Sequence, residues 1–102
     1  MKSKRTKALE ISAAVKRHAY ERDKGCCVLC GSPNGLPNAH YIGRAQGGLG
    51  IEKNVVTLCP ECHREYDQTA RREEMRQELR DYLRGFYPDW DENELIYRKW
   101  EM

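Results

Sequence analysis

Four cysteines arranged as two pairs are the residues whose types and spacing point most directly to chemistry. Cys27 and Cys30 form one C-x₂-C pair, Cys59 and Cys62 form the other, and 28 residues separate the pairs. Two such pairs can supply four thiolates to one tetrahedral ion and leave it no open position, as in structural zinc sites. We therefore expect a zinc ion that stabilises the fold and takes no part in catalysis.

A fifth cysteine, Cys26, lies directly before the first pair. Pairing it with Cys30 would leave three residues between the two, so we expect Cys26 to be a partly packed free thiol. Paired C-x₂-C spacing in a reducing compartment indicates a metal rather than disulfides. A chain of 102 residues with a mean hydropathy of −0.90 has a limited core, so a metal ion would add stability that it needs.

A second set of polar residues lies between and after the cysteines. His63 directly follows the last cysteine on an expected helix, and Asp67 comes one turn later, so both face the same way and can share a divalent ion. His40, from a neighbouring strand, can take a proton from water at neutral pH. Asn54 can tie the glycine-rich loop to that strand, and Arg44 offers a cation to a phosphate.

The elements that position these residues follow from the pattern of apolar and turn-forming residues. Residues 38–43 read as a short strand, and residues 44–52 form a glycine-containing loop. Residues 55–58 are β-branched and apolar, which predicts a second strand, and Pro60 suits the first turn of a helix. Strand, loop, strand and helix make a ββα unit.

The chain before this unit reads as an arm followed by a helix. We expect residues 1–8 to form a basic flexible arm and residues 9–102 to form a single domain, with a core at about 22–68 and a helical part at about 69–102. A helix over 9–22 is predicted by apolar positions at helical spacing, among which His18 is expected to be packed in the core. These positions are Ile11, Ala14, Val15, His18 and Ala19.

The chain after this unit shows a long helical pattern with one apolar stripe. The stripe consists of Met75, Leu79, Tyr82, Leu83 and Phe86. Gly85 and Pro88 disfavour a longer helix, so the sequence predicts that this helix ends near Phe86. Asp91 and Glu94 have the spacing of a capping box, which predicts a last helix. The residues expected to be buried by that helix are Leu95, Ile96 and Trp100.

Positive charge is concentrated at the start of the chain. Residues 1–24 contain eight Lys and Arg against three Asp and Glu, although the whole chain carries only +2. This basic end suits a phosphate backbone, and Lys4, Arg5 and Lys7 are candidate nucleic-acid contacts. A solvated helix face and a disordered tail would explain the same charges. The sequence has no apolar run long enough for a membrane span and no secretion signal, so we expect a cytoplasmic protein without a membrane partner.

The order His40, Asn54, His63 within and after the two cysteine pairs resembles the HNH endonucleases. The Gly-Gly-Leu-Gly loop and the Leu-Cys-Pro-Glu-Cys-His segment are similar to the small phage-type members. The resemblance covers residues 22–68 closely and the helical tail more loosely. It implies an α+β fold: a small ββα-metal core with two zinc knuckles, flanked by an N-terminal helix and by C-terminal helices.

The resemblance also implies roles for the three residues. His40 would be the general base that activates water, Asn54 would orient the loop, and His63 would bind the catalytic divalent ion. The products would be 5′-phosphate and 3′-hydroxyl ends of DNA. Mg²⁺ or Mn²⁺ is the expected ion, and the histidine ligand leaves Ni²⁺, Co²⁺ or Zn²⁺ open.

The sequence departs from the family pattern at Ala39. The family commonly has Asp or His directly before the base, where that residue helps to hold the metal. Asn38, Asp67 or Asn54 are the available replacements, or water fills the shell of a weakly held ion. We favour Asp67.

The leading hypothesis is therefore an HNH endonuclease or nickase acting on DNA as a monomer or weak dimer. If the protein is phage-encoded, it would act in the bacterial host cell, with phage packaging proteins as possible partners. The alternative is a non-catalytic, zinc-stabilised module that binds DNA or protein; Ala39 favours it and the complete His–Asn–His set opposes it. A zinc-dependent deaminase would need a mixed His/Cys site with an open position, which the four cysteines do not offer.

Overall fold

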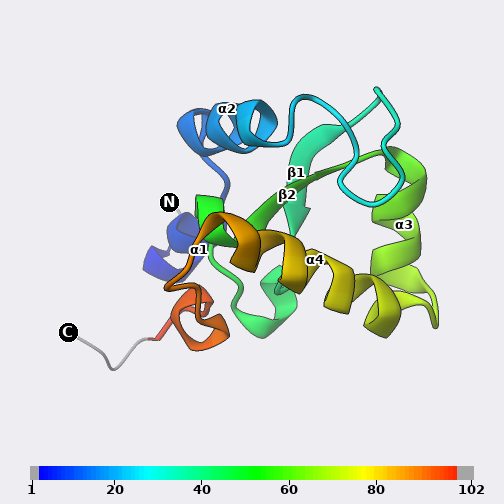
Figure 1. Ribbon diagram of the computed structural model, residues 1–102. Coiled ribbons are helices and arrows are strands. Elements are labelled where there is room, and N and C mark those ends of the chain that lie inside the picture. Colours follow the sequence, from blue (N-terminus) through cyan, green and yellow to red (C-terminus); the bar gives the residue numbers. More distant parts are fainter. Residues whose placement is uncertain (1–2, 99–102) are drawn as a thin grey trace.

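The computed structural model describes residues 3–98, in which a two-stranded antiparallel sheet is combined with helices (Figure 1). The elements in chain order are α1 (Lys4–Leu9), α2 (Ala13–Arg22), β1 (Leu36–His40), the 3₁₀ turns η1 (Arg44–Gln46) and η2 (Glu52–Asn54), β2 (Val55–Leu58), α3 (Pro60–Gln68), α4 (Arg72–Phe86) and η3 (Glu92–Leu95). The expected combination of helices with a small sheet is found. None of the described helices is long and apolar enough to cross a bilayer.

The two strands form the centre of the molecule. β2 occupies the predicted residues 55–58, whereas β1 begins two residues before the predicted strand and ends at His40. His40 pairs with Val55, and the ladder is irregular between Leu36 and Ala39. Directly after β1, the Tyr41 N–H donates to the Asn54 carbonyl at 2.7 Å, which extends the hydrogen bonding between the two chain segments by one residue. The loop between the strands is therefore closed at its base beside His40.

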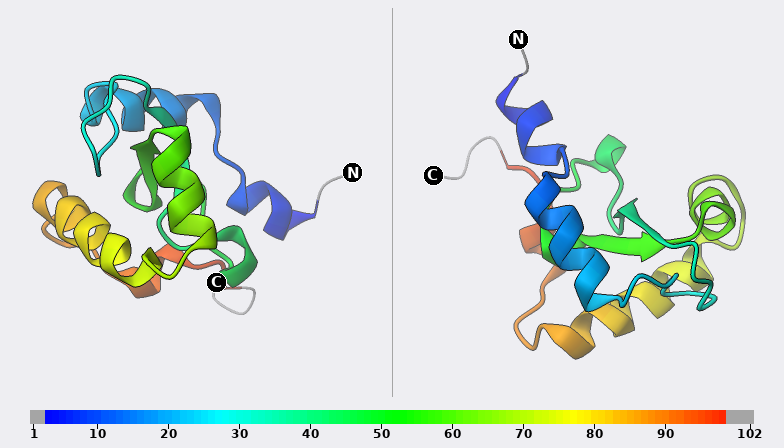
Figure 2. Two further views of the ribbon diagram at one scale, coloured as in Figure 1. Left: turned by 90° about the vertical axis from the view of Figure 1, so that its right-hand side faces the viewer. Right: turned by 90° about the horizontal axis from the view of Figure 1, so that it is seen from above.

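Figure 1 shows the strands between α2 on one side and α4 on the other, and Figure 2 shows α3 packed beside them. One cluster of buried side chains joins the strands to α3, α4 and the C-terminal segment. It includes Ala39, Tyr41, Val56, Leu58, Tyr66, Met75, Leu79, Leu83, Trp90 and Leu95. Tyr41 and Trp90 meet edge to face at 5.3 Å between ring centroids, an arrangement that aromatic pairs favour.

The two later helices match the sequence predictions. Pro60 occupies the first turn of α3, where its missing N–H costs no hydrogen bond, and Cys59 caps that turn. α4 ends at Phe86 as predicted. Met75, Leu79 and Leu83 are buried along its stripe, whereas Phe86 is 47% exposed. Phe86, the last residue of the predicted stripe, packs edge to face on Tyr82 at 5.0 Å between ring centroids instead of entering the core.

The expected flexible arm is wrong for the part of it that the structure describes. Residues 4–8 lie in helix α1, whose first turn is capped by the Ser3 hydroxyl accepting from the Thr6 N–H at 3.1 Å. Leu9 ends this helix and is only 2% exposed. Burial of one large apolar side chain thus holds a segment whose other residues looked mobile in the sequence.

The helix expected over residues 9–22 is interrupted. The chain leaves helical geometry at Glu10, and Ser12 caps a new helix, α2, by accepting from the Val15 N–H at 3.2 Å. Of the predicted apolar face only Ala19 is fully buried. His18 is half-exposed and its Nδ1 lies 3.1 Å from Glu52, so the expectation of a packed core histidine is wrong.

α2 is held instead by a buried ion pair at its C-terminal end. Arg22 and Asp23 form a two-bond contact of 2.8 and 2.9 Å. Asp23 also accepts from the Thr57 N–H and the Tyr82 hydroxyl, while Arg22 donates to the Val55 carbonyl. Because nearly every polar atom of the pair has a partner, its burial is compensated and it links α2 to β2 and α4.

The C-terminal segment forms a 3₁₀ turn rather than the expected last helix. Asp91 caps η3 by accepting from the Asn93 N–H at 2.9 Å, and Leu95 is fully buried. Leu49 then donates its N–H to the Leu95 carbonyl at 2.8 Å, so this segment covers the glycine loop. Trp100, expected to be buried here, lies outside the described residues.

Candidate functional site

The four predicted cysteines converge on one point. The turn that carries Cys27 and Cys30 closes through the Gly31 N–H, which donates to the Cys27 carbonyl at 2.8 Å while Gly31 adopts a φ of 78°. Cys59 and Cys62 come from the start of α3. All four Sγ atoms lie within 4.8 Å of one another.

The spacing of the sulfur atoms fits a single metal ion. Two thiolates on a tetrahedral ion with metal–sulfur bonds of about 2.3 Å lie about 3.8 Å apart. The Sγ atoms of Cys30 and Cys59 are 3.7 Å apart, and none of the five cysteines forms a disulfide. Cys26 is half-buried outside this group, as predicted. The four-cysteine cluster can therefore bind one metal ion.

The thiols of the cluster shift one another's pKa values. Burial raises the pKa of Cys27, but N–H donors of Cys59, Cys30 and Leu29 outweigh burial and lower it to about 7. Burial and the three neighbouring thiols raise the pKa of Cys62 well above that of a free thiol. Because like charges at this spacing repel, ionising all four thiols requires a compensating positive ion.

His40 lies beside this cluster's helix, on β1, with one ring nitrogen held by the main chain. Its Nε2 is 2.8 Å from the Leu9 carbonyl oxygen. A carbonyl only accepts, so Nε2 must carry the proton and the neutral ring presents an unprotonated Nδ1. Burial is the main factor that lowers the pKa of His40 below 6.5; Arg44 and His63 add to the effect, and the bond to Leu9 opposes it. The ring is therefore neutral at pH 7.

Glycine allows the contact between His40 and Leu9. The Gly50 N–H donates to the Ala8 carbonyl at 3.0 Å, and a Cβ on Gly50 would collide with the carbonyl oxygen of Glu10. The glycine loop can thus lie against the end of α1 and hold the Leu9 carbonyl near β1. The sequence offered no signal for this contact, because its partners lie 31 positions apart in the chain.

Asn54 is fully buried behind the pocket and makes the bonds expected of it. Its Oδ1 accepts from the Ile42 N–H at 2.8 Å, and its Nδ2 donates to the carbonyls of Ile42 at 3.1 Å and Leu49 at 2.8 Å. These bonds join the two ends of the glycine loop directly after His40. With its amide engaged in this way, Asn54 is not available as a metal ligand.

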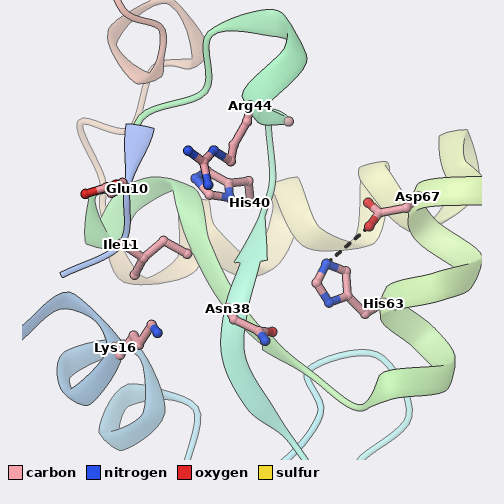
Figure 3. A pocket seen from close by; sticks show the side chains of 9 residues that line it. Glu10, Ile11, Lys16, Asn38, His40, Arg44, His63 and Asp67 are labelled. Atoms are coloured by element: carbon pink, nitrogen blue, oxygen red, sulfur yellow. Dashed lines mark ion pairs between the residues drawn. The ribbon is translucent and has the colours of Figure 1, made fainter. Parts of the chain in front are cut away.

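His63 and Asp67 lie on one face of α3, as their spacing predicts. His63 Nε2 is 3.2 Å from Asp67 Oδ2, and both side chains reach solvent. Figure 3 shows this pair projecting from α3 toward a pocket whose opposite wall carries His40 and Arg44. The pocket has a volume of about 510 Å³. Its lining consists of Glu10, Ile11, Lys16, Asn38, His40, Gly43, Arg44, His63 and Asp67.

The pocket includes residues that sequence reasoning missed. Lys16 reaches it from α2, and Glu10 and Ile11 reach it from the link between α1 and α2. The excess of positive charge in residues 1–24 was the one available signal, and it did not single out Lys16. Of the candidate nucleic-acid contacts, only Arg44 lines the pocket.

The predicted basic residues of the former arm lie on α1. Lys4 and Lys7 are exposed, and neither lines the pocket. Arg5 donates through Nη2 to the Arg44 carbonyl at 3.3 Å, which joins α1 to η1. These residues therefore stand beside the pocket's cationic wall rather than in it.

The strand geometry directs position 39 into the core. Ala39 is fully buried in the core cluster, and the pocket is lined by its neighbours Asn38 and His40 instead. Successive side chains on a strand point to opposite faces, so a residue at position 39 is directed away from the pocket. Of the replacements considered, Asn38 and Asp67 line the pocket and Asn54 does not.

Comparison with known proteins shows a partial similarity. The chain matches no known protein-family profile. It is 39% identical over 41 residues to Anaredoxin from Nostoc sp. strain PCC 7120. The aligned part is 39% of this chain and 54% of that relative, so the chain spans about half the length of the protein it matches.

Proposed function

We propose that this protein is a metal-dependent DNA endonuclease of the HNH type that cuts one strand at a time. The observation that carries the proposal is the placement of three groups around one pocket. His40 has a neutral ring with a free Nδ1, the His63–Asp67 pair lies across the pocket, and Asn54 anchors the loop between the strands. Base, metal ligands and nearby cations are the groups that phosphodiester hydrolysis requires.

The four-cysteine cluster has the role of a scaffold in this proposal. A closed set of four thiolates leaves no position for water, so we assign it a structural zinc ion. A single iron ion also suits four tetrahedral thiolates, and a metal analysis of the purified protein distinguishes the two. Either ion would set the first turn of α3 against the Cys27–Cys30 turn and thereby position His63.

The second metal would bind at His63 and Asp67. Two ligand atoms on adjacent positions of an octahedral ion with bonds of about 2.1 Å lie about 3 Å apart, and His63 Nε2 and Asp67 Oδ2 are separated by 3.2 Å. The pair therefore fits one divalent ion; Asn38 lines the same pocket, and water would complete the shell. When bound, Mg²⁺ or Mn²⁺ supplies positive charge to the phosphate and to the leaving 3′ oxygen.

The chain's own residues would carry the proton and orient the phosphate. His40 Nδ1 accepts a proton from the water whose oxygen forms the new bond to phosphorus. The bond from phosphorus to O3′ breaks, and O3′ takes a proton from solvent, which yields 5′-phosphate and 3′-hydroxyl ends. Arg44 and Lys16 line the same pocket and neutralise the phosphate oxygens. One such pocket acts on one strand, so nicking is the expected first product.

The test is cleavage of supercoiled plasmid by the purified protein with Mg²⁺, Mn²⁺, Ni²⁺ or no added metal. We expect His40→Ala to reduce the rate by about 10² to 10⁴, the usual contribution of a general base. His18→Ala is the matched control, because His18 is half-exposed and contacts Glu52 rather than the pocket. Circular dichroism and the cysteine-bound metal content must be unchanged in both variants.

A non-catalytic zinc-stabilised module that binds DNA or protein is the second candidate. It is favoured by Ala39, which is buried in the core and supplies no ligand to the pocket. If the parent protein cuts no DNA with any of these metals, or if His40→Ala cuts as fast as His18→Ala, the binding module is the better account. Association with phage packaging proteins and the monomer or weak-dimer state stay predictions.

A further inference from the structure

A second pocket adjoins the first and continues it along the surface. It has a volume of about 590 Å³ and shares Gly43 and Asp67 with the first pocket. Asp67 marks the boundary, because it stands at the edge of the first pocket beside His63 (Figure 3). The far wall of the second pocket carries Arg72 and Arg76 from α4. Because the two pockets share two lining residues, we describe them as one groove, and both parts of it are lined by basic side chains.

Arg72 is held rigidly in this groove. Its Nη1 donates to the Tyr66 carbonyl at 2.9 Å, and its guanidinium carbon lies 4.4 Å from the centroid of the Tyr66 ring. Tyr66 is itself fixed, being fully buried with its hydroxyl donating to the Tyr41 carbonyl at 2.6 Å. Stacking on a fixed ring orients the guanidinium in advance, so less conformational entropy is lost when it binds an anion.

Arg72 also keeps its charge uncompensated, unlike its neighbour. Arg76 lies 3.3 Å from Glu73 and 3.4 Å from Glu92, which offset its charge. No carboxylate within residues 3–98 forms an ion pair with Arg72, and a single one of its five N–H groups is used on the Tyr66 carbonyl. The structure therefore presents a fixed cation with free donors, the arrangement that recognises a phosphate.

We propose that the second pocket binds the phosphate next to the one that is cleaved, with Arg72 as its ligand. This inference rests on the proposed nuclease function, because it takes the first pocket as the place of the scissile phosphate. A DNA strand carries a charge at every nucleotide, so a strand seated in one pocket must place its next phosphate along the groove. A divalent ion at His63 and Asp67 would neutralise the carboxylate at the boundary and leave the groove positive.

The first test measures binding of a labelled DNA duplex by fluorescence anisotropy with a divalent ion present, and every protein carries His40→Ala so that the DNA is not cleaved. Arg72→Gln is expected to weaken binding about tenfold and to lower the salt dependence by about one phosphate contact. Arg71→Gln is the matched control: it removes the same charge one residue away, where Arg71 is exposed and paired with Glu65. We expect less than about a twofold effect there. Arg72→Lys keeps the charge but not the stacked guanidinium, so it should restore part of the affinity.

The second test locates the contact along the strand. Phosphates of the duplex are replaced one at a time by neutral methylphosphonates. For the parent protein, neutralising the one phosphate beside the cleavage site should weaken binding. For Arg72→Gln, neutralising that same phosphate should cause no further loss of affinity, whereas neutralising the other contacted phosphates should weaken binding as it does for the parent protein. A variant that binds and cuts like Arg71→Gln, or that responds equally at every position, overturns this inference and leaves the nuclease intact. Absence of DNA binding by the parent protein overturns both proposals.

Thermal unfolding of each variant separates a lost contact from a lost fold. Arg72 packs on Tyr66, so its replacement is expected to lower the melting temperature slightly. An Arg72→Gln protein that keeps its bound metal and its cooperative transition while losing DNA affinity supports the phosphate site. If Arg72→Lys melts like the parent protein yet binds as weakly as Arg72→Gln, the charge is not what binds and the inference fails.

Discussion

The four-cysteine cluster and the histidine pocket share helix α3 but differ in how complete they are. The cluster takes two ligands from the first turn of α3 and two from a facing turn, and its four sulfur atoms already surround one point. The pocket takes His63 and Asp67 from the next turns of the same helix, and both side chains reach solvent. A closed ligand set suits a scaffold, whereas an open one leaves room for water and substrate.

This difference shows that successive turns of one helix can contribute first to a closed cysteine cluster and then to an open pocket. His63 directly follows Cys62, so whatever fixes the first turn of α3 also fixes the start of the pocket wall. The opposite wall is fixed by unrelated means, namely the bonds of Asn54 and the contact of His40 with Leu9. Loss of the cysteine-bound metal should therefore disable the pocket, and changes in the pocket should leave the metal in place.

The largest expected effect comes from breaking the cluster with Cys59→Ser. Binding of a structural zinc ion contributes about 10 kcal/mol or more to the folding of small domains, so the variant should lose its metal and unfold. Metal content per chain and far-ultraviolet circular dichroism are the measurements. Cys26→Ser, outside the cluster, should change neither. A folded Cys59→Ser protein with a full metal complement would show that the cluster is not a metal site.

The converse change, Asp67→Asn, should affect metal activation without affecting the fold. The Asp67 side chain is 52% exposed, so the substitution removes a ligand charge but little packing. We expect the concentration of Mg²⁺ or Mn²⁺ for half-maximal cleavage to rise by at least about tenfold. Asp81→Asn, an exposed carboxylate on α4, is the control. Equal metal activation of the two variants would remove Asp67 from the proposed site.

The dependence of cleavage on pH sharpens the assignment of His40. The base must be neutral to accept a proton, so kcat/KM should rise with pH through the pKa of His40 and then level off. Because burial lowers that pKa, the pH at which kcat/KM is half-maximal should lie below 6.5. Rates between pH 5 and pH 8 at saturating metal give the curve. A half-maximal rate above pH 7 would indicate a different base.

The smallest expected effect concerns the basic residues on α1. Lys4→Gln combined with Lys7→Gln should weaken DNA binding about two- to threefold and lower the salt dependence, because both side chains are exposed beside the pocket and not in it. Lys24→Gln, past the far end of α2, is the control. An effect no larger than that of Lys24→Gln would show that these charges are only solvated.

Part of the fold could be read from local patterns. The β2 strand, the start of α3 at Pro60 and the end of α4 at Phe86 were predictable, because each depends on residues within a few positions of one another. The N-terminal region was not. α1 exists because Leu9 is buried against distant parts of the chain, and α2 is held by the buried Arg22–Asp23 pair rather than by an apolar face.

The candidate site likewise has a part that local spacing predicted and a part that it did not. Spacing alone predicted the two cysteine pairs and the shared face of His63 and Asp67, since thiolates two residues apart in a turn, or side chains four residues apart on a helix, meet by geometry. Only the tertiary structure brings the Leu9 carbonyl to His40, Lys16 to the pocket and Arg72 to the groove beside it. Local spacing decides which side chains share a turn, whereas the packing of distant segments decides which of them share a cavity.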